Sequence, residues 1–250
     1  MRKGLLIGLC VLAGFSVFGQ SINRLSEDLL YAVRTEDSTA IQRQLQKLDQ
    51  LTLQQLTDSL DTDAEKYAFW MNIYNAFIQI QLGDSAELYD RRSRFFSRPS
   101  IDIAGERISF NFIENGILRK SKVLWGLGYI SKVFPGKMEK QLRVEKEDHR
   151  IHFGLNCGAR SCPPIPYFTV DNLEEELQRA EESFVKNNTE VNEKTVVVSK
   201  IFSWFRGDFG GKKGVKQLLV KYNLVDSVDG YKVVFAEYDW SLHLDAYSTN

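Results

Sequence analysis

The sequence lacks any marked excess of charge of one sign, and it has few cysteines. Its 250 residues include 32 lysines and arginines against 33 aspartates and glutamates, a formal net charge of −1, and only three cysteines. This balance gives no electrostatic reason to expect nucleic acid or an anionic membrane as a partner. No internal repeat, low-complexity tract or clear linker divides the chain, and beyond its N-terminus no apolar stretch is long enough to cross a membrane.

The N-terminus has the pattern of a secretory signal peptide. A basic start and an apolar run over residues 4–13 precede the small residue Gly19. We expect cleavage after Gly19, removal of residues 1–19 together with Cys10, and export to the periplasm or to the outside. The alternative is an uncleaved membrane anchor, although the run is short and interrupted by glycine. In an exported chain the two remaining cysteines would meet conditions under which disulfides form.

The first part of the mature chain is predicted to be helical. Residues 20–60 carry apolar side chains at helical spacing and form a helical N-terminal extension packed on the domain that follows. Thr62 and Glu65 have the spacing of a capping box. The helix that they begin, over residues 62–82, is apolar nearly all round and therefore belongs in the middle of a domain.

The remainder mixes short strands and helices. The sequence predicts a hairpin over 100–109, a short helix over 110–119, loop with room for one helical turn over 120–148 and a strand over 150–157. It then predicts a helix over 170–188 with Asp171 as N-cap, a strand over 194–202, a helix over 214–223 and a strand starting at 231. Helices followed by mixed short elements favour one α+β domain over residues 61–250 rather than an alternating parallel-sheet fold.

Two asparagines interrupt the apolar helix. Asn72 and Asn75 lie three residues apart and share a face. A buried amide must be hydrogen-bonded, because leaving it unpaired costs roughly 1–3 kcal/mol. The two side chains therefore either hold neighbouring backbone in place or line a site.

Several segments together resemble a known family. They are "FWMNIYNA" (69–76), "IENGILR" (113–119), "HFGLNCGARSCPP" (152–164), "SKIFSWFRGDFG" (199–210) and "YDWSLH" (238–243). In this order they resemble the bacterial branch of the domain of unknown function 547 family, over roughly residues 60–245. The resemblance implies no settled biochemical role.

The resemblance also bears on single residues. Relatives often have asparagine at the place of His243, which implies that His243 is not an essential base. The plant branch keeps a cysteine at the place of Cys157 but has serine at the place of Cys162. The resemblance therefore implies that Cys157 does not depend on a disulfide in every relative, and that it has a role of its own.

A nucleophilic role for Cys157 would require a base within hydrogen-bond reach or a positive environment. On the predicted strand, His152 would lie about 16 Å from Cys157 and on the opposite face. His243 in the terminal motif is the alternative base. Arg160 could stabilise a thiolate, and Asp239 could orient a histidine.

Other interpretations of the cysteine loop, residues 157–162, stay open. A turn across its four intervening residues could allow a disulfide between Cys157 and Cys162, worth roughly 2 kcal/mol. Cys157 could instead be a small apolar residue in the core. A metal site is not expected, because the spacing exceeds that of a zinc half-site and a second ligand pair is missing. No cofactor is expected.

Two classes of function therefore remain. The first is a thiol-dependent hydrolase or acyl transferase, with catalytic roles for Cys157, His243, His152 and Asn75. The second is a non-catalytic domain that binds a ligand or a protein in a cleft shaped by the cysteine loop, with Asn72, Arg160 and Asp239 as binding residues. Because no base can be placed beside Cys157, the sequence favours the second class.

Overall fold

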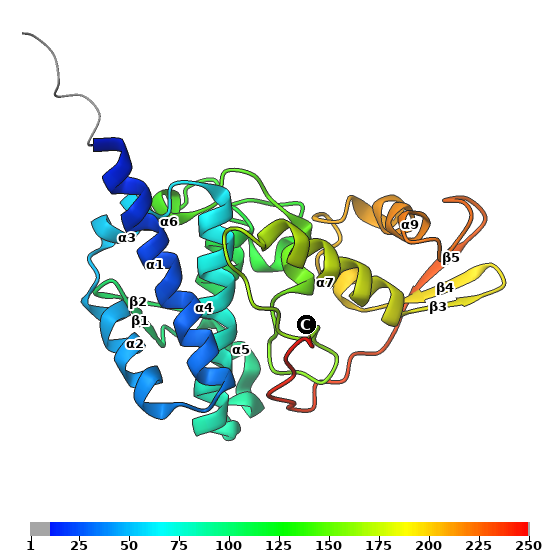
Figure 1. The fold of residues 1–250 in the computed structure, drawn as a ribbon. Coiled ribbons are helices and arrows are strands. Elements are labelled where there is room, and N and C mark those ends of the chain that lie inside the picture. Colours follow the sequence, from blue (N-terminus) through cyan, green and yellow to red (C-terminus); the bar gives the residue numbers. More distant parts are fainter. Residues whose placement is uncertain (1–10, 250) are drawn as a thin grey trace, which may run out of the picture.

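Helix α4 (Asp63–Asp84) lies at the centre of the helical part of the structure (Figure 1). Thr62 and Glu65 form the predicted capping box, each side chain accepting from the other residue's backbone N–H. The turns that follow are buried on all sides, and Phe69 and Trp70 are fully inaccessible. The predicted core helix is confirmed, because a helix without a polar face has to be covered all round.

The structure is a computed structural model that describes residues 11–249, with side chains from Ile22 onward. Residues 1–10 of the expected signal peptide, Cys10 among them, lie outside the described residues. Three helices begin the described chain: α1 (Val11–Arg34), which packs on α4, and α2 (Ser38–Gln50) and α3 (Leu53–Ser59), which pack on α1. Within residues 11–249, no helix is both long and apolar enough to span a membrane.

Short elements continue the chain around α4. They are η1 (Ala86–Arg91), α5 (Arg92–Ser97), β1 (Ile101–Ile103), β2 (Glu106–Ile108), the π-helix η2 (Phe112–Leu118), η3 (Leu124–Gly126) and α6 (Lys137–Leu142). Strands β1 and β2 form the predicted antiparallel hairpin, turning at Ala104 and Gly105, which both have positive φ. The predicted short helix is present, but it has π geometry. Helices of this kind are rare in proteins, and those that occur often lie at functional sites.

A second part forms the arm on the right of Figure 1. It comprises α7 (Leu173–Asn187), β3 (Thr189–Asn192), β4 (Thr195–Val198), α8 (Ile201–Trp204), α9 (Gly211–Lys221) and β5 (Lys232–Phe235). Strand β4 pairs antiparallel with β3 and parallel with β5, and the connection between β4 and β5 contains α8 and α9. These elements bury an apolar cluster of their own. The predicted α+β fold is confirmed.

The strand predicted over 194–202 ends at Val198, because Ile201 and Phe202 begin α8. Two further local predictions are wrong. Residues 150–157 do not form a strand: the Asp148 side chain accepts from the backbone N–H of Arg150 and begins a 3₁₀ helix, η4 (His149–Phe153). The apolar residues there alternate because Ile151 packs into the cluster around α4 whereas Phe153 packs into the cluster of the arm. The N-cap predicted at Asp171 is Asn172 instead.

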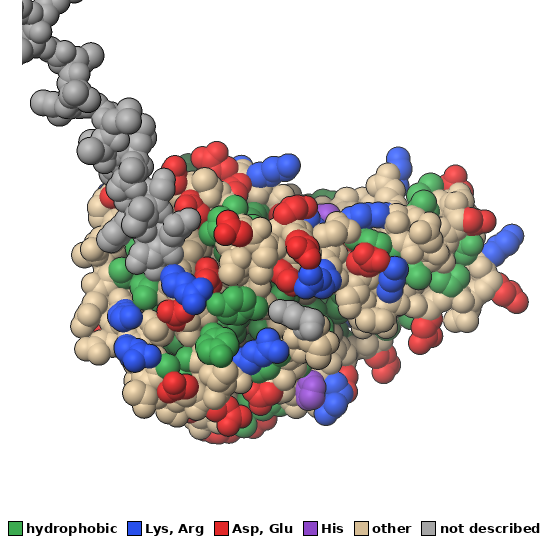
Figure 2. Space-filling model, in the orientation of Figure 1, with side chains coloured by type: hydrophobic (Ala, Val, Ile, Leu, Met, Phe, Trp, Pro, Cys, Tyr) green, Lys and Arg blue, Asp and Glu red, His purple; other side chains and the backbone are tan. Residues whose placement is uncertain are grey.

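The C-terminal segment returns from the arm to the helical part. It is the red trace in Figure 1 that runs from β5 back toward the middle of the molecule. Single β-bridges join Ala159 to Leu242 and Ile165 to Tyr247, so this segment lies against the cysteine loop and the residues that follow it. On the face shown in Figure 2, acidic and basic side chains are interspersed, in keeping with the near-zero net charge.

The close approach of η4 to α4 should depend on Gly154. A Cβ at this position would overlap the Met71 side chain and the Phe168 ring, both in the core. Gly154→Ala should therefore lower the free energy of unfolding by about 1–3 kcal/mol in denaturant titrations. The matched control is Gly83→Ala in α4, where a Cβ meets no atom within 4 Å and helix propensity should add about 0.5–1 kcal/mol. Equal destabilisation of both variants would contradict this account.

Candidate functional site

A cavity of about 180 Å³ lies where the cysteine loop meets the C-terminal segment, and we call it the thiol cleft. Its walls come from α4, η2, α8 and the segment after β5. It is lined by Tyr74, Phe96, Asn111, Glu114, Leu124, His152, Leu155, Cys157, Cys162, Pro163, Ile201, Trp204, Phe205, Tyr238 and Trp240. A cavity lined mainly by apolar and aromatic side chains, with a few converging polar groups, is the usual form of a small-molecule site.

Hydrogen bonds from a side chain of α4 hold the backbone next to the two cysteines in place. The Asn75 side chain donates to the Gly154 carbonyl and accepts from the Asn156 N–H. The buried Asn156 side chain in turn donates to the Pro163 carbonyl and accepts from the N–H of Gly158, whose φ is +85°. This chain of amides spans both ends of the cysteine loop, so the two thiols are presented by a rigid turn.

The two thiols are in contact within the cleft. Cys157 Sγ and Cys162 Sγ lie 2.6 Å apart as free cysteines. The Cys157 backbone N–H also donates to Cys162 Sγ at 3.1 Å, and the Tyr238 hydroxyl lies 3.2 Å from Cys162 Sγ and 3.8 Å from Cys157 Sγ. The structure thus holds the pair without a disulfide bond, and the disulfide stays a prediction.

This geometry makes the two cysteines chemically different. The hydrogen bond with Cys162, and then burial, raise the pKa of Cys157 well above its ordinary value. Burial also acts to raise the pKa of Cys162, but hydrogen bonds from Cys157 and Tyr238 outweigh it and lower that pKa. When one proton leaves the pair, the thiolate is therefore held at Cys162.

His152 also lines the thiol cleft. The predicted strand would have placed it on the face opposite Cys157. Its Nε2 lies 2.8 Å from Asp208 Oδ2, and its ring stacks on Phe205 at 3.8 Å between centroids. Arg119 completes the cluster, with Nε donating to Asp208 Oδ2 at 2.7 Å. The Arg119 and Asp208 side chains are 2 % and 7 % exposed, so this is a buried ion pair. No hydrogen bond joins the His152 ring to either thiol among the described residues.

The charges of this cluster follow from its burial. Burial lowers the pKa of His152 to about 4, although Asp208 acts in the opposite direction. Burial would raise the pKa of Asp208, but hydrogen bonds from His152 and Arg119 hold it well below its usual range. At neutral pH the cluster is therefore one ion pair and a neutral imidazole.

Glu114 is a further titratable group that lines the cleft. It belongs to the π-helix η2, and burial raises the pKa of its carboxyl despite the nearby Arg119. Sequence reasoning singled out neither Glu114 nor Tyr238 as a site residue, although both lie in the motifs "IENGILR" and "YDWSLH". The motifs were the available signal, but only the fold shows that both side chains line the thiol cleft and that Tyr238 contacts the cysteines.

The remaining candidate residues have other surroundings. Asn72 donates to the Phe168 carbonyl and accepts from its N–H, so both central asparagines hold backbone in place. Arg160, Asp239 and His243 are exposed and do not line the thiol cleft. The Arg160 Nε lies 3.7 Å from Asp239 Oδ2, and the backbone N–H of His243 donates to Gly158 O in the cysteine loop.

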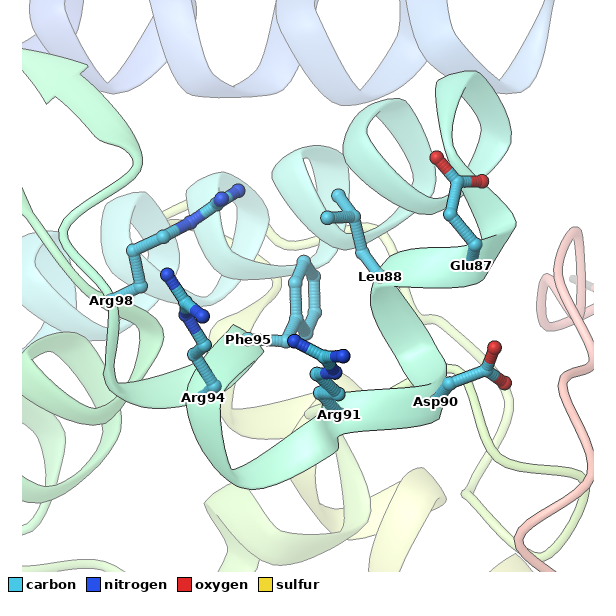
Figure 3. Close-up of a pocket in the computed structure, with 7 residues that line it drawn as sticks. All are labelled: Glu87, Leu88, Asp90, Arg91, Arg94, Phe95 and Arg98. Carbon is cyan, nitrogen blue, oxygen red and sulfur yellow. The ribbon is translucent and has the colours of Figure 1, made fainter.

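A second, larger cavity of about 370 Å³ lies beside η1 and α5 (Figure 3). Leu88 and Phe95 point between its charged side chains, which are Glu87, Asp90, Arg91, Arg94 and Arg98. The three arginines are exposed, and the cavity contains no thiol or imidazole. The thiol cleft is the better candidate because its polar groups are desolvated and in contact with one another. Among the described residues, no group of three or more His, Cys, Asp or Glu side chains could hold a metal ion.

Comparison with known proteins decides the family. Residues 57–185, over half of the chain, match the family described as "Protein of unknown function, DUF547". The chain belongs to the DUF547 family. No curated protein and no solved structure matches it. The range that matches DUF547 contains both cysteines but ends in α7. Two residues of the site therefore lie outside this range: Tyr238, which contacts Cys162, and Asp208, which contacts His152.

The neutral state of buried His152 should appear as a pH dependence of stability. An unfolded histidine binds a proton near pH 6.5, whereas folded His152 does so only near 4. The unfolded state therefore binds more protons between these values, and stability present above pH 6.5 is lost as the pH falls toward 4. Between pH 7 and pH 5 the free energy of unfolding should drop by about 2 kcal/mol from this residue.

Denaturant titrations of three proteins measure this contribution. His152→Gln should show a flatter pH dependence than the wild type between pH 7 and pH 5. The exposed His243 provides the matched control, and His243→Gln should keep the wild-type slope. An unchanged slope in His152→Gln would show that His152 titrates alike in both states.

Proposed function

We propose that the DUF547 domain of this chain carries out thiol–disulfide exchange in the thiol cleft, with Cys162 as the attacking thiolate and Cys157 as the resolving thiol. One observation carries the proposal: the Cys157 thiol, the Cys157 N–H and the Tyr238 hydroxyl all converge on Cys162 Sγ. Hydrogen bonds to the charged form stabilise a thiolate, and the thiolate is the nucleophile in exchange.

The reaction balances without a further reactant. The Cys162 thiolate attacks one sulfur of a substrate disulfide, forms a mixed disulfide and releases the other half as a thiolate. Cys157 then passes its proton to the released thiolate and attacks Cys162 Sγ, which releases the second half of the substrate as a thiolate that solvent protonates. The substrate disulfide is reduced to two thiols, and Cys157 and Cys162 are oxidised to a disulfide. Their contact at 2.6 Å supports the second step.

The surroundings of the pair favour an organic disulfide with an apolar group. Trp204, Tyr238 and Trp240 pack against one another at one side of the cleft, with ring centroids 4.7–5.3 Å apart. Aromatic walls bury apolar ligand surface and leave the few polar groups to orient it. We also propose that the chain is exported and belongs to the bacterial branch, as residues 1–19 and the five motifs suggest. Export would bring the pair into a compartment where disulfides occur.

The proposal limits which relatives share the activity. Exchange with an internal resolving thiol needs both cysteines. Relatives with serine at the place of Cys162, as in the plant branch, would therefore lack it. A role common to all of them would have to come from the rest of the cleft.

A non-catalytic binding cleft is the second candidate. It is favoured by the His152 ring, which bonds to Asp208 and makes no hydrogen bond to either thiol among the described residues. Acyl transfer with Cys157 as nucleophile has less support, because the pKa of Cys157 is raised and no histidine or carboxylate of the described residues hydrogen-bonds to its thiol. In the binding alternative the two cysteines would shape the cleft and remain unreactive.

The test uses 4,4′-dithiodipyridine, a neutral aromatic disulfide, on the folded, reduced chain in a Cys10→Ser background. The wild-type pair should release two equivalents of thiopyridone near neutral pH and end without an adduct, lighter by two hydrogen atoms. Cys157→Ser should release one equivalent and keep a mixed disulfide on Cys162. Release counts come from absorbance and end products from intact mass.

The matched variant Cys162→Ser isolates the other thiol. Its Cys157 should react at least about tenfold more slowly than the Cys162 of Cys157→Ser. Tyr238→Phe should slow Cys162 because it removes one hydrogen bond to the thiolate. Equal rates at the two cysteines, or a wild-type product with two adducts, would contradict exchange. Thiols that stay unreactive in the folded protein would favour the binding cleft.

A further inference from the structure

The segment that follows the π-helix exposes large apolar side chains. We call residues 124–134 the apolar loop. Its exposed members are Leu124, Trp125, Leu127, Tyr129, Ile130, Val133 and Phe134. Phe134 is 92 % exposed, Val133 81 % and Trp125 75 %. Elsewhere in the described chain, large exposed apolar side chains are scattered. A concentration of this kind marks a surface that functions in contact with something else.

The apolar loop is held in this outward position by its own backbone. Val123 N–H donates to Ile130 O, and Lys122 pairs with Ser131 in a β-bridge, so the two ends of the loop are tied together. Gly207 N–H donates to Leu127 O and anchors the middle of the loop to the segment after α8. The side chains from Leu124 to Ile130 are therefore presented on an ordered turn, and Val133 and Phe134 follow directly after its tied end.

The charged side chains in and just after the apolar loop are mostly basic, with three lysines and one carboxylate, that of Glu139, in residues 123–140. Residues 123–138 contain two lysines and no aspartate or glutamate. Lys132 pairs with the buried Glu139, whereas the exposed Lys137 and Lys140 on α6 form no ion pair in the described part of the chain. The whole-chain charge of −1 conceals this local excess. Tryptophan and tyrosine together with lysine are the residues that favour the boundary between lipid tails and headgroups.

We propose that the apolar loop docks on the surface of a lipid bilayer that carries anionic headgroups. Trp125, Val133 and Phe134 insert among the acyl chains, and Lys137 and Lys140 face the headgroup phosphates. Side chains that stand this far out of the protein suit a fluid partner, because protein interfaces concentrate their binding energy in well-packed surfaces. This inference does not depend on thiol exchange.

Docking would place the thiol cleft next to the bilayer. Leu124 belongs both to the apolar loop and to the lining of the cleft. Trp240, which also lines the cleft, is 36 % exposed. The apolar surface is therefore continuous from the loop to the cleft.

The experiment measures binding of the full chain to vesicles of phosphatidylcholine, alone or mixed in equal parts with phosphatidylglycerol. Co-sedimentation should show tighter binding to the mixed vesicles. Trp125→Ser combined with Phe134→Ser should weaken binding at least about tenfold. Replacing Lys137 and Lys140 by glutamine should cost about fivefold for each lysine on mixed vesicles, with no change on phosphatidylcholine alone. Tyr31→Ser, an exposed aromatic on α1, is the matched control and should bind as the wild type does.

A second measurement identifies the residue that inserts. Brominated phosphatidylcholine quenches tryptophans that enter the acyl region. Trp125→Phe should keep most of the binding but lose most of the quenching. Binding without quenching of Trp125 would assign membrane contact to another segment, such as the N-terminus, and would overturn the proposal. An absence of vesicle binding would also overturn the proposal. If the chain instead forms dimers that Trp125→Ser combined with Phe134→Ser abolishes, the apolar loop would be a surface between two copies of the chain.

Discussion

The side-chain amide of Asn75 is the interaction on which the candidate site depends. From the buried face of α4 it satisfies the Gly154 carbonyl and the Asn156 N–H, two backbone groups in a segment without regular hydrogen bonding. Each such group left unpaired in the core would cost roughly 1–3 kcal/mol. Asn156 then extends the same support to Gly158 and Pro163. The thiols owe their fixed separation to side chains of the core rather than to a sheet.

A buried ion pair links this helical part to the arm. Arg119 ends the π-helix η2, whereas Asp208 lies between α8 and α9, so their contact joins segments that are 89 residues apart. Removing one partner of a buried pair leaves a charge without compensation, which typically costs 3–5 kcal/mol. Burial is the main cause of the neutral state of His152, and the positive charge of Arg119 acts in the same direction, against the opposing effect of Asp208.

The elements that the sequence predicted well are those that local patterns determine. The capping box at Thr62, the apolar circumference of α4 and the turn at Ala104 and Gly105 are all encoded within a few residues. The 3₁₀ helix η4 was not predictable in this way, because its alternating apolar residues reflect two separate clusters on either side of it rather than a strand. The cysteine loop was singled out correctly as a candidate site. Its chemical asymmetry, however, depends on the contact between the two thiols and on Tyr238, 76 residues further along the chain than Cys162.

The same limit applies to composition. Averages over the chain gave a balanced charge, yet residues 123–138 depart from that average in both charge and exposure. A close contact with the segment after α8 holds the apolar loop in its exposed position. Gly128 approaches Asp208 and Gly207 so closely that a Cβ on either glycine would overlap the other segment. Asp208 thus lies against Gly128 of the apolar loop through its side chain and its backbone nitrogen, and its carboxylate contacts His152. One residue outside the matched family range joins the exposed surface, the buried charges and the wall of the thiol cleft.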